Sequence, residues 1–335
     1  MSHRIVSYNI LSSHLADPEH FPNCDPVHLD ANNRLEKILV KLIPDIQQQS
    51  IICLQEVSIT WAGALHAFFA AHGYYFTTAQ YGGAYNNYMG VGIAWPLARY
   101  QALDIDITRL SDTRKWQRKP KFEYYKMTCL NFLARKLRIR KLKIDDPLAM
   151  AKRRFNQVVF VRFKDTRDDS VFCVANYHMP CAFYAPKVMT LHVAMYVQLV
   201  QKLSQNTPYI LTGDFNIKPH SPQYQLITTG ALDTSAKAYP DTNKEDGWTP
   251  EIKQPLRSAY ATYQGKEPKF TNYAQVLNNP VFIETLDYIW LSQAWHVKSV
   301  LPLPGLKEVD GPFPNEIEPS DHIAIAAELT LEHSK

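Results

Sequence analysis

Five polar residues of catalytic type stand at points where apolar segments of the sequence end. They are Asn9 after IVSY, Glu56 after IICLQ, His178 after FCVANY, Asp214 after YILTG and Asp287 after FIETL. Strand ends hold functional side chains in many α/β proteins, because the rigid sheet fixes them while loops surround them. If these ends converge, Glu56, Asp214 and Asp287 lie in one pocket together with Asp321.

Such a group of carboxylates would need a cation to offset its negative charge. Like charges at close range cannot all stay ionised alone, and a divalent ion resolves the conflict. Hard oxygen ligands without thiolates favour Mg²⁺ or Mn²⁺ over zinc. The five cysteines, at positions 24, 53, 129, 173 and 181, lack the close spacing of a zinc site. We therefore predict a site for Mg²⁺ or Mn²⁺.

The elements that must position these residues are strands and helices mixed along the whole chain. Apolar runs predict strands over residues 3–10, 50–54, 74–78, 92–95, 157–163, 171–177, 209–212, 285–291 and 323–331. Apolar residues at a spacing of three to four predict helices over 35–46, 60–72 and 186–203. The stretch 236–269, rich in Pro, Lys, Asp and Gly, is typical of loops with a short helix.

Composition indicates an ordinary globular protein, with 46% hydrophobic and 20% charged residues. The opening MSHRIVSYNIL has too short an apolar part for a secretory signal. The apolar stretch 188–200 contains His192 and Gln198 and is too short and too polar to span a bilayer. An odd number of cysteines favours a reducing compartment. We expect an intracellular, cytoplasmic protein.

Positive charge is concentrated in a basic block, which we define as residues 109–154. It holds 16 Lys and Arg against four Asp and Glu, a net charge of +12, whereas the whole chain carries +4. Aromatic residues at positions 116, 122, 124 and 125 are interleaved with the charges and could stack on nucleic-acid bases. A phosphate-facing surface, a solvated helix or loop face, and a protein-binding face all remain open interpretations.

Six short motifs follow one another along the chain in this order: SYNIL, CLQEV, NYHMP, GDFN, TLDYIW and PSDH. In order and spacing they resemble the endonuclease/exonuclease/phosphatase superfamily, which has the DNase I-like fold. The resemblance runs from residue 5 to about residue 331. It implies one domain over residues 1–335, of class α/β, built as a four-layer sandwich of two mostly antiparallel β-sheets flanked by helices.

Three further stretches are similar to the nocturnin and carbon-catabolite-repression deadenylase branch: PFPNEIEPSDHIAIAAEL, KFTNY and FIETLDYIW. In that branch the Phe that matches Phe282 helps to hold the terminal adenine. The chain also departs from the branch. It has Tyr177 where Thr is usual, its His178 is followed by Met-Pro-Cys, and YMGVGIAWP lacks a preceding Lys-Asp-Gly.

The resemblance implies a role for each motif residue. Glu56 would bind the metal, with Asn9 and Asp321 beside it. Asp214 would align the attacking water, Asn216 and His178 would hold the phosphate, and Asp287 would orient His322. The substrate-binding candidates are Phe282, Phe270, Asn176 and Asn272. Simpler alternatives are a turn cap for Asn9, an Asx turn for Asp214 and core packing for the two phenylalanines.

We therefore expect a Mg²⁺-dependent phosphodiesterase that uses in-line water attack, of the 3′-to-5′ exoribonuclease and deadenylase type, with RNA as its partner. Other enzymatic alternatives are an abasic-site DNA endonuclease and a phosphatase acting on a nucleotide 2′-phosphate, an inositol phosphate or a phospholipid head group. A non-catalytic binding module is the alternative from another class. The presence of Glu56 and of GDFN at residues 213–216 argues against it.

Overall fold

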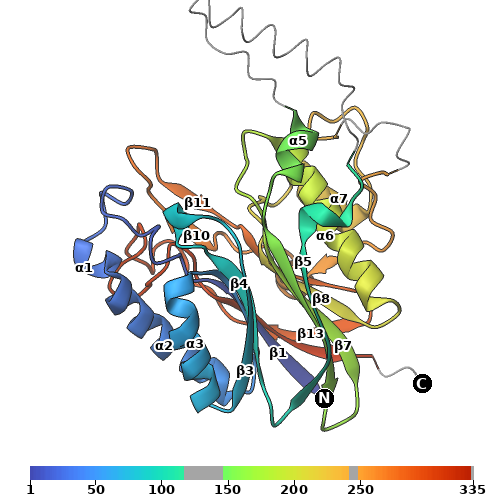
Figure 1. Cartoon of the computed structure of the whole chain (residues 1–335), viewed down its shortest axis with the longest axis horizontal. Helices are drawn as coiled ribbons and strands as arrows, with labels where there is room; N and C mark the ends of the chain where they lie inside the picture. The colour runs from blue at the N-terminus through green and yellow to red at the C-terminus, as the bar shows by residue number, and fades with distance from the viewer. Residues whose placement is uncertain (117–145, 241–247, 333–335) are drawn as a thin grey trace, which may run out of the picture.

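A computed structural model describes residues 1–116, 146–240 and 248–332 of the chain (Figure 1). Two six-stranded sheets dominate it. The first has the order β13-β14-β1-β2-β4-β3 and the second has the order β5-β6-β7-β8-β12-β9. The strands β1 with β2, and β7 with β8, pair in parallel, and the other neighbouring strands pair antiparallel.

The strands of the first sheet are β1 (Ser2–Asn9), β2 (Ile51–Val57), β3 (Tyr74–Gln80), β4 (Gly90–Pro96), β13 (Trp295–Val300) and β14 (Ile325–Leu331). Those of the second are β5 (Tyr100–Arg109), β6 (Gln157–Asp165), β7 (Val171–His178), β8 (Tyr209–Asp214), β9 (Arg257–Ser258) and β12 (Asp287–Leu291). A small hairpin joins β10 (Asn272–Ala274) to β11 (Phe282–Glu284).

The α-helices are α1 (Pro26–Leu29), α2 (Ala31–Gln47), α3 (Ile59–Ala71), α5 (Pro147–Lys152), α6 (Pro186–Ser204), α7 (Pro222–Thr229) and α8 (Ala259–Gln264). The described residues also form two short 3₁₀ helices, η1 (Ala84–Asn86) and η2 (Leu110–Thr113). Local signals start several helices. Asp30 accepts from two backbone amides of α2, and Ser221 caps α7 ahead of a proline in the first turn.

Three apolar cores separate four layers. One core packs α2 and α3 against the first sheet, with Ile38 and Leu65 among its members. A second lies between the two sheets and includes Ile93 and Val161. The third packs α6 against the second sheet. Figure 1 shows α2 and α3 on one outer face and α6 and α7 on the other. This confirms the predicted four-layer α/β sandwich of two mostly antiparallel sheets.

Strand register brings the polar strand ends to one edge of the sandwich. In the second sheet, Asp214 is paired in register with His178 on one side and with Asp287 on the other. In the first sheet, Asn9 is opposite Gln55, the residue before Glu56. Asp287 differs from expectation, because it begins β12 rather than ending an apolar strand. Since β12 runs antiparallel to β8, its start meets the end of β8.

Three of the four edge strands, β5, β9 and β13, were not predicted. Most residues of β5 are exposed or half-buried, and the same holds for β13, so neither strand carries a continuous apolar run. Of the basic block, residues 117–145 lie outside the described part of the chain, and with them three of its four interleaved aromatics. No helix among the described residues is long and apolar enough to cross a membrane.

Candidate active site

A cavity of about 840 Å³ opens at the edge where the two sheets meet. Its lining includes seven predicted site residues that carry polar groups: Glu56, His178, Asp214, Asn216, Asn272, Asp321 and His322. Phe282 lines it as well. Residues from six separate segments of the chain therefore meet in one place.

Glu56 reaches the cavity through an irregularity in β2. The register between β2 and β4 shifts between Gln55 and Val57, and Glu56 has a φ of 59°. Such a bulge redirects a side chain near a functional site. The carboxylate accepts from the backbone amide of Ser12 at 3.0 Å and from Asn9 Nδ2 at 3.0 Å. Glu56 is thus held by the segment that follows β1.

Asn9 bridges two carboxylates with its amide nitrogen. Its Nδ2 also donates to Asp214 Oδ2 at 3.1 Å, and its Oδ1 accepts from the amide of Leu11. The oxygen that a metal would need therefore already accepts a backbone hydrogen bond. In this structure Asn9 links Glu56 to Asp214.

Asp214 lies at the centre of the cluster. His178 Nε2 is 3.5 Å from Asp214 Oδ2, and His322 Nε2 is 3.7 Å from the same oxygen. The other oxygen accepts from the amide of Asn216 at 2.8 Å. Burial raises the pKa of the Asp214 carboxyl to about 6; the two imidazoles oppose this rise and Asp287 adds to it.

Gly213 allows β8 to place Asp214 there. Its φ is +141°, and a Cβ at this position would lie 1.8 Å from the carbonyl oxygen of Tyr177 on β7. Only glycine tolerates both conditions. Close packing against β7 therefore explains the glycine at position 213, and the chemistry of the acidic cluster explains the aspartate at position 214.

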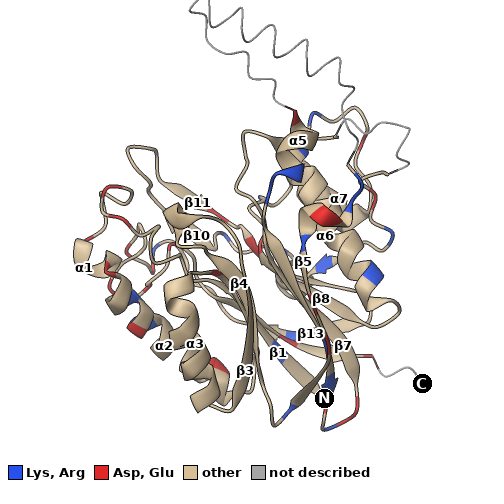
Figure 2. Ribbon diagram, viewed as in Figure 1, with Lys and Arg blue, Asp and Glu red and all other residues tan. Residues whose placement is uncertain are grey.

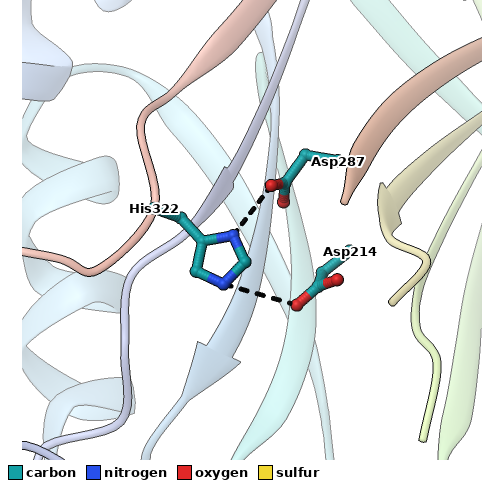
Figure 3. A group of neighbouring side chains, drawn as sticks. All are labelled: Asp214, Asp287 and His322. Atoms are coloured by element: carbon teal, nitrogen blue, oxygen red, sulfur yellow. Dashed lines mark hydrogen bonds and ion pairs between the residues drawn. The ribbon is translucent and has the colours of Figure 1, made fainter. Parts of the chain in front are cut away.

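His322 is fixed by Asp287. The distance from His322 Nδ1 to Asp287 Oδ2 is 2.7 Å, and Figure 3 shows the imidazole between Asp287 and Asp214. Burial alone would lower the pKa of His322, but the carboxylates of Asp287, Asp321 and Asp214 outweigh it and raise the pKa well above its ordinary value. The imidazole of His322 is therefore easier to protonate than that of a free histidine.

Several buried polar atoms at the site have no hydrogen-bond partner. Among the described residues they include Asp287 Oδ1, Asp321 Oδ1 and His178 Nδ1. Asp321 Oδ2 accepts from Asn272 Nδ2 at 3.3 Å. Orphaned carboxylate oxygens inside a cluster of acids suit a hard divalent cation. Asp214, Asp287 and His322 also offer atoms within 4.8 Å of one another.

Two predicted substrate-binding residues lie away from the cavity lining. Asn176 is fully buried and joins the two sheets, because its Nδ2 donates to the carbonyls of Leu54 and Gly92 at 2.8 Å. Phe270 is 1% exposed and packs with Phe313 and Ile323. Both side chains are engaged inside the fold, and neither faces the cavity in which a substrate would bind.

Sequence reasoning missed two positioning residues. Thr271, inside the KFTNY motif, donates to Asp287 Oδ2 at 2.6 Å and accepts from the Asp287 amide at 3.1 Å. Arg34 has no exposed surface and donates to the carbonyls of Ile10, Leu11 and Pro319. Arg34 is one charged residue among others in the α2 sequence, and nothing in that sequence indicated that its side chain would be buried.

The comparisons with known proteins agree with this geometry. A sequence profile described as "Endonuclease/Exonuclease/phosphatase family" matches residues 6–322. The chain belongs to this family. It is therefore a hydrolase of phosphate esters, and its described fold is that of the family.

Relatives within the family include fungal and plant proteins. The chain is 28% identical over 371 residues to the CCR4-Not complex 3'-5'-exoribonuclease subunit Ccr4 of Aspergillus niger, an alignment covering 99% of this chain and 52% of that protein. It is 31% identical over 203 residues to carbon catabolite repressor protein 4 homolog 4 of Arabidopsis thaliana, which covers 56% of this chain and 44% of that protein. The predicted branch is confirmed. The chain spans about half the length of the curated relatives it matches.

Solved structures of the same fold include ANGEL2, a 2',3'-cyclic phosphatase, in complex with adenosine-2',3'-vanadate. Its TM-score is 0.74 at 19% identity, over 99% of this chain and 96% of that chain. The human nocturnin catalytic domain has a TM-score of 0.64 at 18% identity, over 99% and 94%. At these identities the likeness concerns the fold.

Proposed function

We propose that this protein is a Mg²⁺- or Mn²⁺-dependent 3′-to-5′ exoribonuclease of the deadenylase type. The observation that carries the proposal is the convergence of Glu56, His178, Asp214 and His322 on one cavity that also has Phe282 in its wall. The name of the Ccr4 relatives, which specifies a 3'-5'-exoribonuclease, supports the choice among phosphate esters. The free cysteines at positions 24, 53, 173 and 181 are consistent with a cytoplasmic site of action.

Glu56 and Asp321 would hold the metal. Glu56 is buried and Asp321 is half-buried, both carboxylates line the cavity, and the free Oδ1 of Asp321 needs a partner. Asn9 would keep Glu56 and Asp214 at a fixed spacing through its two donor contacts. A divalent ion held there would offset part of the negative charge of the acidic cluster and would supply Lewis-acid polarisation of the phosphodiester.

The remaining groups would act on the substrate directly. Asp214 would accept a proton from the attacking water and align it, because its Oδ2 faces the centre of the cluster. His178 and His322 would donate to non-bridging phosphate oxygens. Asn216 would support Asp214 through its backbone amide, while its side-chain nitrogen donates to the Met179 carbonyl.

Phe282 would stack on the terminal adenine. Its ring is half-buried, lines the cavity, and lies 6.0 Å from the ring of Phe183. Lys218 Nζ lies 5.0 Å from the ring centroid and pairs with Glu284. An aromatic ring fixed in this way offers a stacking surface to a base. Asn272, which contacts Asp321, would border the same region.

Release of AMP from a 3′-hydroxyl oligoadenylate in the presence of Mg²⁺ tests the proposal. We expect release from the wild-type chain, none with EDTA, and a fall of about 10²- to 10⁴-fold in Asp214→Asn, since a positioned base contributes that much. Glu36→Gln, which changes an exposed acid on α2, is the matched control. Hydrolysis of abasic DNA or of small phosphate monoesters without any action on RNA would contradict the proposal.

A further inference from the structure

A second wall of the cavity carries positive charge. Residues Arg153, Arg154 and Phe155, which we call the Arg153–Phe155 rim, connect α5 to β6 and line the same cavity as Glu56 and Asp214. Within the described part of the chain, the two arginines are the cavity's lining residues of Lys or Arg type. Figure 2 shows basic residues at α5 and next to it. Arg153 and Arg154 are the last two residues of the basic block.

The rim is held in place by hydrogen bonds to its backbone. Arg109 donates from Nε to the Arg154 carbonyl and from Nη2 to the Lys152 carbonyl, each at 3.0 Å. Ser111 Oγ also donates to the Arg154 carbonyl, at 2.6 Å. Next along the chain, Asn156 Nδ2 donates to the carbonyl of His178 at 2.8 Å. The rim therefore has a fixed position relative to a site residue.

Neither rim arginine forms an ion pair with a carboxylate of the described residues. Arg154 Nη2 donates to the hydroxyl of Tyr184 at 3.2 Å. Lys218, close to Phe282, differs because Glu284 neutralises it. A guanidinium without a carboxylate partner, beside a phosphate-ester site, can bind a phosphodiester with its planar donor fork.

Phe155 provides an aromatic surface next to these charges. It is 60% exposed although it is a large apolar residue. The guanidinium of Arg109 lies 4.5 Å from its ring centroid and fixes the ring on one side. Proteins that bind single-stranded nucleic acid combine exposed aromatic rings, on which bases stack, with cations that follow the backbone.

We infer that the Arg153–Phe155 rim is a second nucleotide subsite. It would bind the phosphodiester and the base next to the terminal nucleotide of a single-stranded RNA. The inference rests on the proposed function, in which the terminal base stacks on Phe282. A cavity of about 840 Å³ is near the upper end of the range for small-ligand pockets, roughly 300–1,000 Å³, and extends from the acidic cluster to the rim. The rim thus selects a polymer over a mononucleotide.

Two variants and two substrates test the subsite. The variants are Arg154→Ala and Phe155→Ala, and Lys152→Ala, an exposed neighbour outside the cavity lining, is the matched control. The substrates are an octameric oligoadenylate and bis(p-nitrophenyl) phosphate, a phosphodiester too small to reach the rim. We expect Phe155→Ala to lower kcat/KM on the octamer about 5- to 150-fold more than on the small ester, the loss for one stacked base.

Salt dependence separates the arginine from the ring. For Arg154→Ala, the slope of log affinity against log salt should become shallower by about 0.7, the value for one phosphate contact on a single strand. Lys152→Ala should keep the wild-type slope. Equal losses on both substrates, or an unchanged salt slope together with unchanged octamer kinetics, would overturn the subsite.

Binding of a fluorescent octamer in an Asp214→Asn background distinguishes the two proposals. If the wild-type chain hydrolyses the small ester but not RNA, the exoribonuclease function fails. In that case, weaker octamer binding by Phe155→Ala would still support the subsite. Equal octamer binding with and without the ring would contradict it. A variant that loses the folded circular dichroism signal is replaced by Phe155→Leu, which keeps the apolar volume and removes the stacking face.

Discussion

His322 Nδ1 lies 2.7 Å from Asp287 Oδ2, and the same Asp287 oxygen accepts from Thr271 Oγ1 at 2.6 Å. Three residues from separate segments thus form a chain of hydrogen bonds that ends at the cavity. Because the carboxylate accepts a hydrogen bond from Nδ1–H, His322 Nε2 is turned toward Asp214. The orientation and charge of the imidazole therefore depend on Asp287.

Asp287→Asn should lower kcat about 10²- to 10³-fold, the usual loss for one donor to a developing charge. The amide cannot favour the imidazolium as the carboxylate does. Thr271→Val removes one of the two hydrogen bonds to Asp287 Oδ2 and the acceptor of the Asp287 amide, but it leaves the bond to His322, so kcat should fall only about fivefold, equivalent to ~1 kcal/mol. Steady-state kinetics on an oligoadenylate measure both. Wild-type kcat in Asp287→Asn would show that His322 acts without its partner.

Glu56→Gln should abolish metal binding while leaving the fold intact. A ligand at 100 times its dissociation constant stabilises the folded state by about 2.7 kcal/mol, so Mn²⁺ should raise the melting temperature of the wild-type chain. The variant should not respond. With EDTA, the variant should be at least as stable as the wild type, because it removes one charge from a cluster of acids. Calorimetry measures both, and an equal Mn²⁺ response in the variant contradicts the role of Glu56.

Gly213→Ala should lower the free energy of unfolding by about 3 kcal/mol or more, since the added methyl meets the Tyr177 carbonyl and the backbone has a positive φ. Gly265→Ala is the matched control. Its φ is +76°, but nothing lies within 4 Å of an added Cβ. Strain alone should cost it about 1–2 kcal/mol. Urea unfolding compares the two, and equal losses would mean that close packing with β7 adds nothing.

Much of this site can be predicted from the sequence, because the points at which buried strands end can be recognised in it. The strands that carry Glu56, His178 and Asp214 are buried and mostly apolar, and each has this polar residue at or next to its end. An apolar run does not indicate which other strand its own strand pairs with. Only the antiparallel pairing of β12 with β8 explains why Asp287 reaches the site from a strand start.

Other features depend on packing that has no local signature. Asn176 has the residue type of a substrate contact, but it satisfies two carbonyls between the sheets. Tyr177, a departure from the branch, has its hydroxyl 2.8 Å from His192 on α6. The replacement of Thr by Tyr is therefore matched by a partner on another element. Neither contact is visible as periodicity or composition.

Arg34→Lys should lower the free energy of unfolding by roughly 2–4 kcal/mol. Arg34 joins the loop after Asn9 to the loop before Asp321 through its three carbonyl contacts. Lysine keeps the charge but lacks the planar fork, so buried carbonyls lose donors. Arg4→Lys, which faces the single carboxylate of Asp45, should cost about 1 kcal/mol and is the control. Chemical unfolding decides, and equal costs would remove the special role of Arg34.

His192 should make the fold sensitive to acid. It is fully buried, with Nδ1 2.8 Å from the Tyr177 hydroxyl and Nε2 3.2 Å from the Ala151 carbonyl. Burial lowers its pKa to about 3, from an ordinary value of 6.5. Between these values the unfolded chain binds a proton that the folded chain refuses. The stability is thus complete above pH 6.5 and is lost as the pH falls, by about 1.4 kcal/mol per pH unit.

His192→Gln keeps a donor and an acceptor but cannot be protonated. The free energy of unfolding, measured by urea denaturation from pH 7.5 to pH 5, should therefore fall less steeply in the variant than in the wild type, by about 1.4 kcal/mol per pH unit below pH 6. His66→Gln, which removes an exposed imidazole from α3, controls for the loss of a histidine. Parallel curves for the wild type and His192→Gln would show that the folded chain protonates this imidazole as readily as the unfolded chain does.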